Sequence, residues 1–416
     1  MAREVIGAAV LSVGDELLRG DITDTNAVFL SRALSDLGFD VRRLGAVGDD
    51  LDSIATVLRQ TLNVARVVII TGGLGPTEDD LTRQGIAAVL GETPEVDETL
   101  LAGIRARFTA MGRPMTANNA QQALLIPSAT AIPNPDGTAP GWLIQGDHAI
   151  AALPGPPSEM RPMWADTVRP ALEGLLPTRV AMIALMTFGV GESVVAERIA
   201  EIIHADPDVT VATYARAAGV EVHITARGAT DAEADRRAGE AAQAVRQALG
   251  EAVYGEGNVT LADVIGGCLA KDRASVATME SATGGMLSNL ITNTDGSSQY
   301  FRGGIVAYSR EAKAAHGVPA EIMDAHGLIS PETAVAMAGA ARRRFGAEIG
   351  LATTGIAGSD AVESHPPGTA FVAVDCGGRI RTRELHRPGS RETAKMYFAQ
   401  SALDLLRLEL HRKASP

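Results

Sequence analysis

The chain has 416 residues, of which 46% are hydrophobic and 21% charged, and its net charge is −13. This is the composition of a folded globular protein with about three domains. The acidic balance argues against broad nucleic-acid binding, which draws on clustered Lys and Arg, but it allows a nucleotide in a local pocket of donors.

Membrane and secretory signals are absent from the sequence. No stretch approaches the roughly 18 apolar residues of a membrane span, and the short apolar run at the start is interrupted by Gly14 and Asp15. The two cysteines, Cys268 and Cys376, form neither a disulfide framework nor a metal-type spacing. We expect a cytoplasmic protein with no membrane association.

Strand and helix patterns alternate in the first predicted domain, residues 1–170. Strands and helices follow one another in the order Val5–Val13, Thr25–Gly38, Asp40–Val47, Leu51–Asn63 and Arg66–Thr71. The last of these is continuously apolar, as expected for a strand buried on both faces. The alternation predicts a doubly wound parallel sheet in an α/β domain.

Two motifs of this domain carry chemistry, GDELLRGDITDTN and TGGLGPTEDDLTR. A glycine loop after a buried strand offers backbone amides to phosphates, and adjacent carboxylates suit a hard divalent cation that shares substrate phosphates. The candidate phosphate and ligand contacts are Gly72, Gly73, Gly75, Thr77, Asn26 and Thr82. The candidate metal ligands are Asp79, Asp80, Glu16 and Asp24. In the alternative interpretation, Asp79 and Asp80 only place favourable charge at a helix N-terminus.

A small α+β module is predicted for residues 178–256. Its strands and helices are Met182–Gly189, Ser193–Ile203, Val209–Tyr214, Glu221–Arg227 and Asp231–Leu249. A second α/β domain, residues 259–416, follows. In it the strand Ser275–Met279 leads into the turn Glu280–Gly285 and then a helix.

Ser281 stands where this strand turns into a helix, a position that faces the ligand crevice of an open α/β sheet. The amides of Thr283, Gly284 and Gly285 are candidates to hold a phosphate or an oxyanion. The motif has no histidine, so the candidate base is Lys313, neutral if buried, with Tyr308 as a proton relay. The alternative is that Ser281 caps a helix, Tyr308 fills the core and Lys313 is solvated.

The whole chain resembles the CinA family (competence/damage-inducible protein A). The matching runs are TMESATGG, FRGGIVAYSREAK, HGLISPETA, LATTGIAG and PPGTAFVAV. The resemblance implies a nicotinamide mononucleotide (NMN) deamidase in the C-terminal domain, which needs no cofactor and has its serine, tyrosine and lysine at Ser281, Tyr308 and Lys313. It also implies phosphate or ribose contacts from Thr283, Gly284, Gly285, Thr354, Gly355, Ala357 and Arg391.

The N-terminal domain resembles the molybdopterin-binding fold, whose Gly-Gly-x-Gly…Asp-x-Thr pattern places Asp80 and Thr82. In CinA relatives this domain is associated with hydrolysis of ADP-ribose to AMP and ribose 5-phosphate, assisted by a divalent ion (Mg, Mn or Co). The middle module is similar to a KH-type fold but lacks the Gly-x-x-Gly loop that clamps RNA. We interpret it as structural or dimer-building, which predicts a homodimer or higher homo-oligomer.

Two departures from the family pattern are visible. Ala282 stands where many relatives have cysteine, which leaves the nucleophile intact. The loop Ser359–Gly368, SDAVESHPPG, is acidic where relatives are often glycine-rich, and it could alter specificity if it closes over substrate. The sequence therefore predicts a two-activity hydrolase of pyridine-nucleotide salvage. The alternatives are a pterin- or nucleotide-binding protein linked to competence, and a non-catalytic C-terminal domain kept for oligomer structure.

Overall fold

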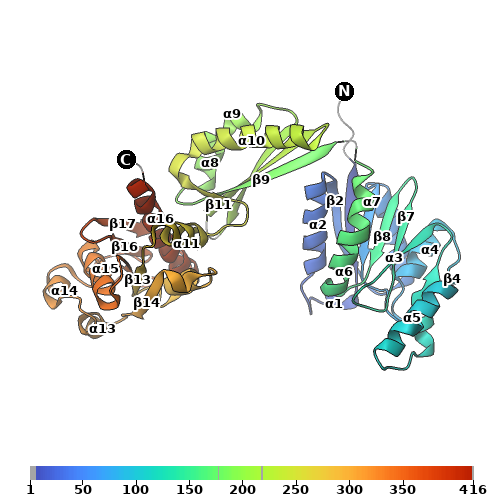
Figure 1. Cartoon of the computed structure of the whole chain (residues 1–416), viewed down its shortest axis with the longest axis horizontal. Coiled ribbons are helices and arrows are strands. Elements are labelled where there is room, and N and C mark those ends of the chain that lie inside the picture. The colour runs from blue at the N-terminus through green and yellow to red at the C-terminus, as the bar shows by residue number, and fades with distance from the viewer. Residues whose placement is uncertain (1–5, 177, 217–218, 415–416) are drawn as a thin grey trace. The chain divides into compact units, whose positions relative to one another are not determined.

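A computed structural model describes residues 6–176, 178–216 and 219–414 (Figure 1). The chain forms two compact units, one of residues up to 181 with 227–235, the other of residues 182–226 with those from 236 onward. Val5, which begins the predicted first strand, lies outside the described residues, as do the outermost residues of the two predicted terminal domains.

The N-terminal domain is built on a six-stranded sheet in the order β2-β1-β3-β8-β7-β6. The strands β2, β1, β3 and β8 are parallel, which confirms the predicted doubly wound core, and β7 and β6 add an antiparallel edge. The sheet strands are β1 (Gly7–Val13), β2 (Asp40–Val47), β3 (Val67–Thr71), β6 (Ala129–Ile132), β7 (Gly141–Gln145) and β8 (Ala149–Leu153), and β4 (Glu95–Val96) pairs with β5 (Leu124–Leu125).

Helices cover both faces of this sheet because each face of β1 and β3 is apolar. One face packs against α2 (Thr25–Leu37), α6 (Pro157–Met163) and α7 (Arg169–Glu173). The other packs against α3 (Leu51–Leu62) and α4 (Thr82–Leu90), as Figure 1 shows. The remaining helices are α1 (Asp15–Leu18) and α5 (Glu98–Ala110).

The middle module has a four-stranded sheet in the order β10-β11-β9-β12. Its elements are β9 (Arg179–Thr187), α8 (Glu192–Arg198), α9 (Ala200–Ile203), β10 (Val209–Arg216), β11 (Gly219–Gly228), α10 (Asp231–Leu249) and β12 (Val253–Glu256). The predicted helix Ser193–Ile203 is thus two short helices. Burial alternates along β11, as expected for a sheet with one face covered by helices.

The C-terminal domain has a five-stranded sheet in the order β14-β13-β15-β16-β17. Its strands are β13 (Val276–Glu280), β14 (Phe301–Val306), β15 (Ile349–Gly355), β16 (Thr369–Asp375) and β17 (Ile380–His386). Strand β13 is parallel to both its neighbours, so the ends of β13, β14 and β15 meet at one edge. Strands β16 and β17 complete the sheet in antiparallel order.

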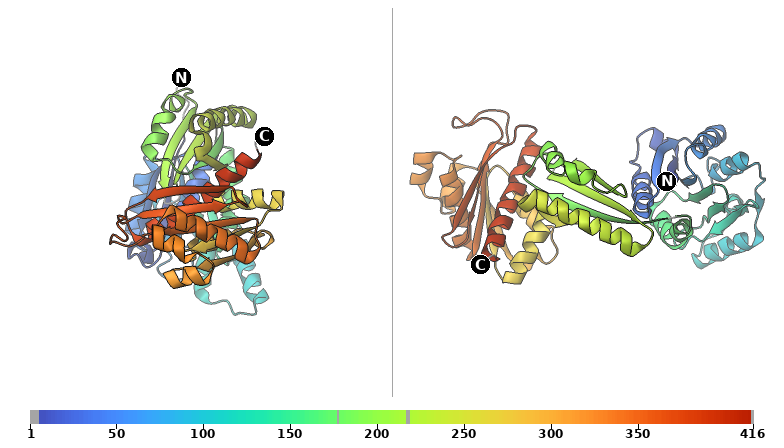
Figure 2. Two further views of the ribbon diagram at one scale, coloured as in Figure 1. Left: turned by 90° about the vertical axis from the view of Figure 1, so that its left-hand side faces the viewer. Right: turned by 90° about the horizontal axis from the view of Figure 1, so that it is seen from above.

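Two groups of helices sandwich this sheet (Figure 2). One face is covered by α11 (Leu261–Asp272), α12 (Met286–Thr292) and α16 (Arg391–Ala414). The other is covered by α13 (Arg310–Ala315), α14 (Ala320–His326) and α15 (Pro331–Phe345). The carboxyl ends of the parallel strands therefore open into a crevice between helix layers, the usual ligand position in such sheets.

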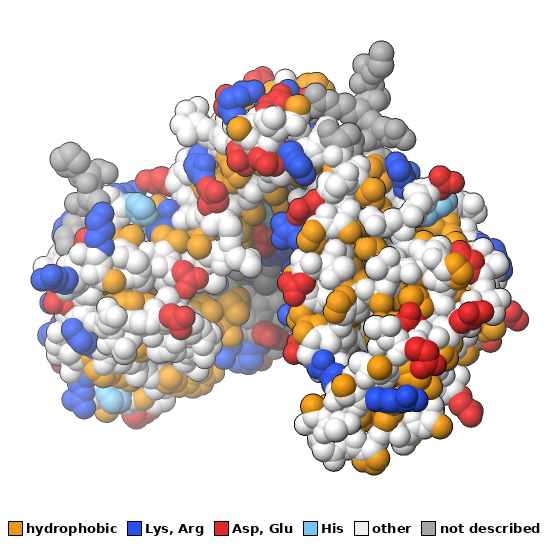
Figure 3. Space-filling view, turned by 45° about the vertical axis from the view of Figure 1, so that its right-hand side comes forward, with side chains coloured by type: hydrophobic (Ala, Val, Ile, Leu, Met, Phe, Trp, Pro, Cys, Tyr) orange, Lys and Arg blue, Asp and Glu red, His pale blue; other side chains and the backbone are white. Residues whose placement is uncertain are grey.

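Charged side chains of both signs are interspersed on the face shown in Figure 3, where Lys and Arg form no continuous basic surface. Among the described residues, no helix has the length and apolar character needed to cross a membrane. The oligomeric state stays a prediction.

Candidate active site

The turn after β13 is held by a buried carboxylate. Glu280 is fully buried, and its two oxygens accept hydrogen bonds from the amides of Gly285 (2.9 Å), Leu287 (3.0 Å) and Ser288 (2.8 Å). The Ser288 hydroxyl donates a further bond of 2.5 Å. The amide of Gly285, predicted to face a phosphate or oxyanion, is therefore already occupied by the protein itself.

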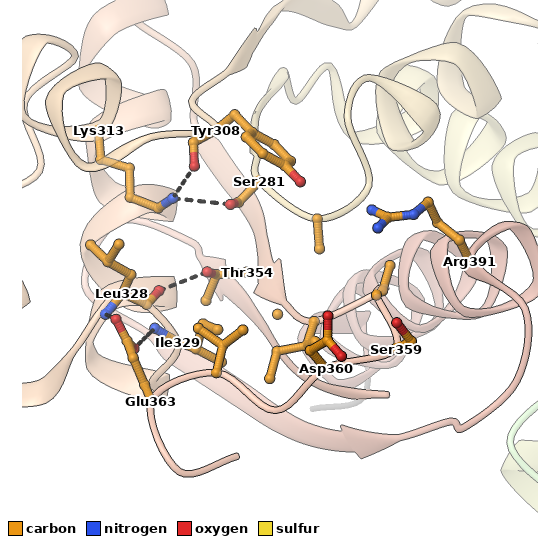
Figure 4. Close-up of a pocket in the computed structure, with 16 residues that line it drawn as sticks. Ser281, Tyr308, Lys313, Leu328, Ile329, Thr354, Ser359, Asp360, Glu363 and Arg391 are labelled. Atoms are coloured by element: carbon orange, nitrogen blue, oxygen red, sulfur yellow. Dashed lines mark hydrogen bonds between the residues drawn. The ribbon is translucent and has the colours of Figure 1, made fainter. Parts of the chain in front are cut away.

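Ser281 and Lys313 meet directly at the bottom of the crevice (Figure 4). Lys313 Nζ lies 3.0 Å from Ser281 Oγ. The Ser281 amide donates to the Thr353 carbonyl on β15, so the serine backbone is fixed between two strands. Ser309 caps α13 by accepting from the Ala312 amide and thereby sets the helix that carries the lysine.

The surroundings of Lys313 fit a neutral amine. Its side chain is buried, and the hydrogen-bond partners of its amine among the described residues are Ser281 Oγ and the carbonyl oxygens of Ala307 (3.0 Å) and Tyr308 (3.3 Å). A neutral amine has two hydrogens for those carbonyls and one lone pair for the serine proton. Burial lowers the pKa of Lys313 to about 8, against an opposing contribution from Glu363. The pair thus has the geometry of a serine nucleophile and its general base.

Tyr308 takes a different place from the one predicted. Its carbonyl accepts from Lys313, while its ring is 66% exposed and extends beside the pocket (Figure 4). Because Lys313 reaches Ser281 without an intermediary, no relay is needed between them in this arrangement. A role for the hydroxyl towards substrate stays a prediction.

A pocket of about 340 Å³ opens over this pair, which is within the size range of small-molecule sites. The residues predicted from the sequence that line it are Ser281, Tyr308, Lys313, Thr354, Gly355, Ala357 and Arg391. Three others do not line it. Thr283 is fully buried, with its hydroxyl 2.6 Å from that of Thr353, and Gly284 and Gly285 form the left-handed part of the turn.

Free hydrogen-bond donors remain at two places around the pocket. The amides of Ala282 and Thr283 donate to no described residue, and Ala282 lines the pocket beside the nucleophile. At the mouth, Arg391 begins α16, whose first turn Ser390 caps, and its guanidinium makes no hydrogen bond or ion pair with described residues. Lys395 follows one turn later, close to Gly284 and equally unpaired among the described side chains. Both cations suit an anionic group.

Further residues that the sequence did not single out as site residues line this pocket, and four of them bear on its chemistry. Asp360 and Glu363 come from the loop Ser359–Gly368, and Leu328 and Ile329 precede α15. The only sequence signal for the first two was the acidic character of that loop. The positions of Leu328 and Ile329 depend on tertiary contacts and had no signal.

A second pocket, of about 410 Å³, lies at the carboxyl ends of β1, β3 and β8. It is lined by the predicted Glu16, Gly72, Gly73, Gly75, Thr77, Asp79 and Asp80, together with Asp49, Gln122 and Glu159, which the sequence did not single out. Gly72 has φ +100, and a Cβ there would lie 2.1 Å from the Val13 carbonyl oxygen, so only glycine fits. The amides of Gly73 and Leu74 donate to no described residue, and both residues line this pocket.

The structure gives Asp80 a role in holding the loop. One of its oxygens accepts from the Gly75 amide (2.7 Å), and the other accepts from the amide (2.8 Å) and hydroxyl (2.5 Å) of Thr77. Buried Arg83 supports the same loop by donating to the carbonyls of Leu74 and Pro140. Among the predicted metal ligands, Asp80 is therefore already engaged by the protein, as is Asp24, which caps a helix.

The remaining predicted residues of this domain divide between structure and pocket. Thr82 is buried and donates to the Gly72 carbonyl (2.8 Å), and Asp24 caps α2 through the Ala27 amide. Asn26 lines an adjoining pocket with Asp24 and Glu16, and its buried Oδ1 has no partner among the described atoms. Within the described chain, no group of three or more His, Cys, Asp or Glu side chains is arranged to hold a metal by itself.

Family comparisons match the whole architecture. Residues 9–174 match a probable molybdopterin binding domain, 184–255 a damage-inducible protein CinA KH domain and 258–410 a CinA C-terminal domain. A putative competence-damage inducible protein of Clostridium novyi is 38% identical over 409 residues, covering 98% of this chain and 99% of that protein. The chain belongs to the CinA family.

Other CinA relatives give the same result. A CinA-like protein of Frankia casuarinae is 42% identical over 412 residues, covering 96% of this chain and 95% of its own. The crystal structure of CinA from Thermoplasma acidophilum, described as a protein of unknown function, is 38% identical and covers 40% of this chain and 98% of that chain, with a TM-score of 0.38. The predicted family resemblance and the three-part fold are confirmed.

The buried Glu280 yields a stability prediction. In Glu280→Gln the amide nitrogen of the new side chain cannot accept, so buried N–H groups of the turn lose partners, and the free energy of unfolding should fall by about 3 kcal/mol. Glu321→Gln, at an exposed carboxylate of α14, is the matched control and should change it by less than about 0.5 kcal/mol. Chemical denaturation of both variants measures this. Equal stability of the two would contradict the role given to Glu280.

Proposed function

We propose that the C-terminal domain hydrolyses a carboxamide, namely that of NMN, to give nicotinate mononucleotide and ammonia. The observation that carries the proposal is the buried Lys313 amine 3.0 Å from Ser281 Oγ, with only neutral oxygens around it. The choice of substrate rests on the family resemblance, and on a pocket whose mouth carries the unpaired cation Arg391.

The reaction follows from the positions of the donors. Neutral Lys313 takes the Ser281 proton as Oγ attacks the carboxamide carbon, and the resulting oxyanion is met by the free amide of Ala282, which lines the pocket beside Ser281. The lysine ammonium then returns its proton to the departing nitrogen, which leaves as ammonia. Water, deprotonated by Lys313, attacks the acyl-serine, the acyl–Oγ bond breaks, and Lys313 returns the proton to Ser281 Oγ. The acid product is released as its carboxylate, having lost its own proton to solvent.

The nucleotide's phosphate matches the other end of the pocket. Arg391 presents a planar set of donors suited to paired hydrogen bonds with a phosphate, and Lys395 adds a point charge near Gly284. A substrate anchored there would extend its ring towards Ser281. Such anchoring supplies the positioning that nucleophilic attack requires.

Ammonia release from NMN tests the proposal directly. Ser281→Ala and Lys313→Met should each lower kcat by about a thousandfold or more, because each removes one member of a unit that acts together. Coupled detection of ammonia on folded variants measures this. Arg391→Ala is the comparison, since it should mainly raise KM. Full activity in Ser281→Ala would exclude the serine as nucleophile.

The pH profile tests the state of the lysine. Because Lys313 acts when neutral and its pKa is lowered to about 8, kcat/KM should rise with pH up to about 8 and level off above it. Below that point it should fall about tenfold for each pH unit. A rate that is flat from pH 6 to 9 would contradict a lysine base.

We propose, second, that the N-terminal domain binds and hydrolyses ADP-ribose. The free amides of Gly73 and Leu74 beside a pocket of about 410 Å³ support recognition of a pyrophosphate. Burial raises the pKa of Asp49, and the neighbouring carboxylates of Glu16 and Asp79 raise it further. These carboxylates fit a magnesium-type ion that is shared with ligand phosphates, because such ions need only one or two carboxylates from the protein. Glu16 and Asp79 would hold that ion, which would supply charge neutralisation.

Product chromatography with ADP-ribose tests this second activity. AMP should appear only with added Mg²⁺, Mn²⁺ or Co²⁺, and Asp79→Asn should reduce it at least tenfold without loss of folding, because its carboxylate is not used by the loop. Asp80→Asn is the contrast, since it should also destabilise the glycine loop. Binding of ADP-ribose without turnover would favour the alternative of a nucleotide-binding domain.

A further inference from the structure

We propose that Glu363 is a positioning residue that latches the loop Ser359–Gly368 onto Leu328 and Ile329 and so keeps the Ser281–Lys313 pair enclosed. The inference rests on the proposed role of Lys313 as the base. It adds a function for a residue that touches neither nucleophile nor base, from a loop that the sequence marked only as acidic.

The latch is a carboxylate seated on two consecutive amides. Glu363 Oε1 accepts from Leu328 N at 3.0 Å and Oε2 from Ile329 N at 2.9 Å (Figure 4). Gly327 makes room for it, since a Cβ there would lie 2.5 Å from Glu363 Oε2. The two segments are 34 to 35 residues apart in the chain, so the contact closes one side of the pocket.

The backbone of the loop is strained where the latch sits. Glu363 has φ +50 and Ser364 φ +64, and among the described residues only Arg273 shares a positive φ without being glycine. Strained conformations of this kind persist where surrounding contacts impose them, and they gather at functional sites. Here the two residues are the centre of a tight turn that Val362 and His365 close, because the amide of each donates to the carbonyl of the other (3.2 and 2.9 Å). The turn presents the Glu363 carboxylate to the two amides.

Both backbone polar groups of Leu328 are hydrogen-bonded. Its carbonyl accepts from the Thr354 hydroxyl at 2.7 Å while its amide donates to Glu363. Thr333 ties the same segment to α15 by donating to the Gly327 carbonyl at 2.6 Å. Because Leu328, Thr354 and Glu363 all line the pocket that contains Lys313, release of the latch would admit water to the lysine.

Glu363 affects the pKa of Lys313 in two opposite ways, through its charge and through the enclosure of the pocket. Among the titratable groups that line the pocket, Glu363 alone acts on the pKa of Lys313, and its negative charge raises that pKa. The other titratable groups that line the pocket are Tyr308, Asp360 and Arg391. On the lysine's own helix, Arg310 pairs with Asp324 and Glu311 is exposed, and buried Glu280 is engaged by amides. Burial is the larger influence and lowers the pKa. Loss of the charge alone therefore lowers the pKa, whereas loss of the enclosure raises it.

Two substitutions test the latch on the full chain without substrate. Glu363→Ala removes both bonds, so exchange of the Leu328 and Ile329 amides should quicken at least tenfold, and the midpoint of Lys313 acetylation against pH should move upwards. Glu363→Gln keeps one acceptor oxygen and loses the charge, so that midpoint should move downwards. Hydrogen exchange and trace labelling with acetic anhydride, both read by mass spectrometry, measure these changes.

Asp360→Ala is the matched control, since it removes a carboxylate of the same loop that makes no bond to Leu328 or Ile329. It should leave both the exchange and the labelling midpoint unchanged. Unaltered exchange and an unaltered midpoint in Glu363→Ala would overturn the latch. If that variant does not fold, exchange of the Leu328 and Ile329 amides at the wild-type rate in Glu363→Gln, which loses one of the two bonds, overturns it. These readouts stand whether or not NMN is turned over, so failure of the latch and failure of the proposed function are distinguishable.

Discussion

The C-terminal site depends on keeping one lysine amine out of water. Lys313 has no carboxylate within hydrogen-bond reach, and its three contacts are a hydroxyl and two carbonyls. A buried ammonium without a counterion is costly, and the amine responds by giving up its proton more readily. The carbonyls of Ala307 and Tyr308 can serve it because β14 ends just before them, and the Ala307 amide is pinned to the Glu280 carbonyl at 2.8 Å. The pairing of β14 with β13 therefore fixes the carbonyls that position the Lys313 amine.

The glycine turn after β13 does not leave all of its amides free for a ligand. The amides after β13 looked available for an anion, as is common where a strand enters a helix. Glu280 already supplies that anion from within, and so the turn is rigid before any ligand binds. Two groups of donors have no partner among the described residues. They are the amides of Ala282 and Thr283, which follow Ser281, and the side chains of Arg391 and Lys395 on α16. In the proposed reaction, oxyanion and phosphate would therefore bind at separate places and would not compete for one turn.

Local sequence patterns predicted the elements that depend on neighbours in the chain. The buried strand β3 with its glycine loop, and the placement of Ser281 after β13 and Lys313 on the next helix but one, follow from short motifs. The contact of Glu363 with Leu328 brings together segments 35 residues apart, and no local pattern encodes such a pairing. Asp80 and Glu280 show the same limit, because which hydrogen bonds a carboxylate makes is decided by loop closure in three dimensions.

The two pockets share one arrangement of carboxylates and hydrogen-bond donors. In each, a carboxylate next to a glycine turn is consumed by the turn's own amides, Asp80 in one domain and Glu280 in the other. N–H donors are among the groups that remain without partners among the described residues, at Gly73 and Leu74 in the first pocket and at Ala282 and Arg391 in the second. Unpaired donors at a pocket wall are satisfied by anionic or carbonyl oxygens. A chain with a net charge of −13 can therefore select phosphate-bearing ligands, since selection depends on these few oriented donors and not on the overall charge.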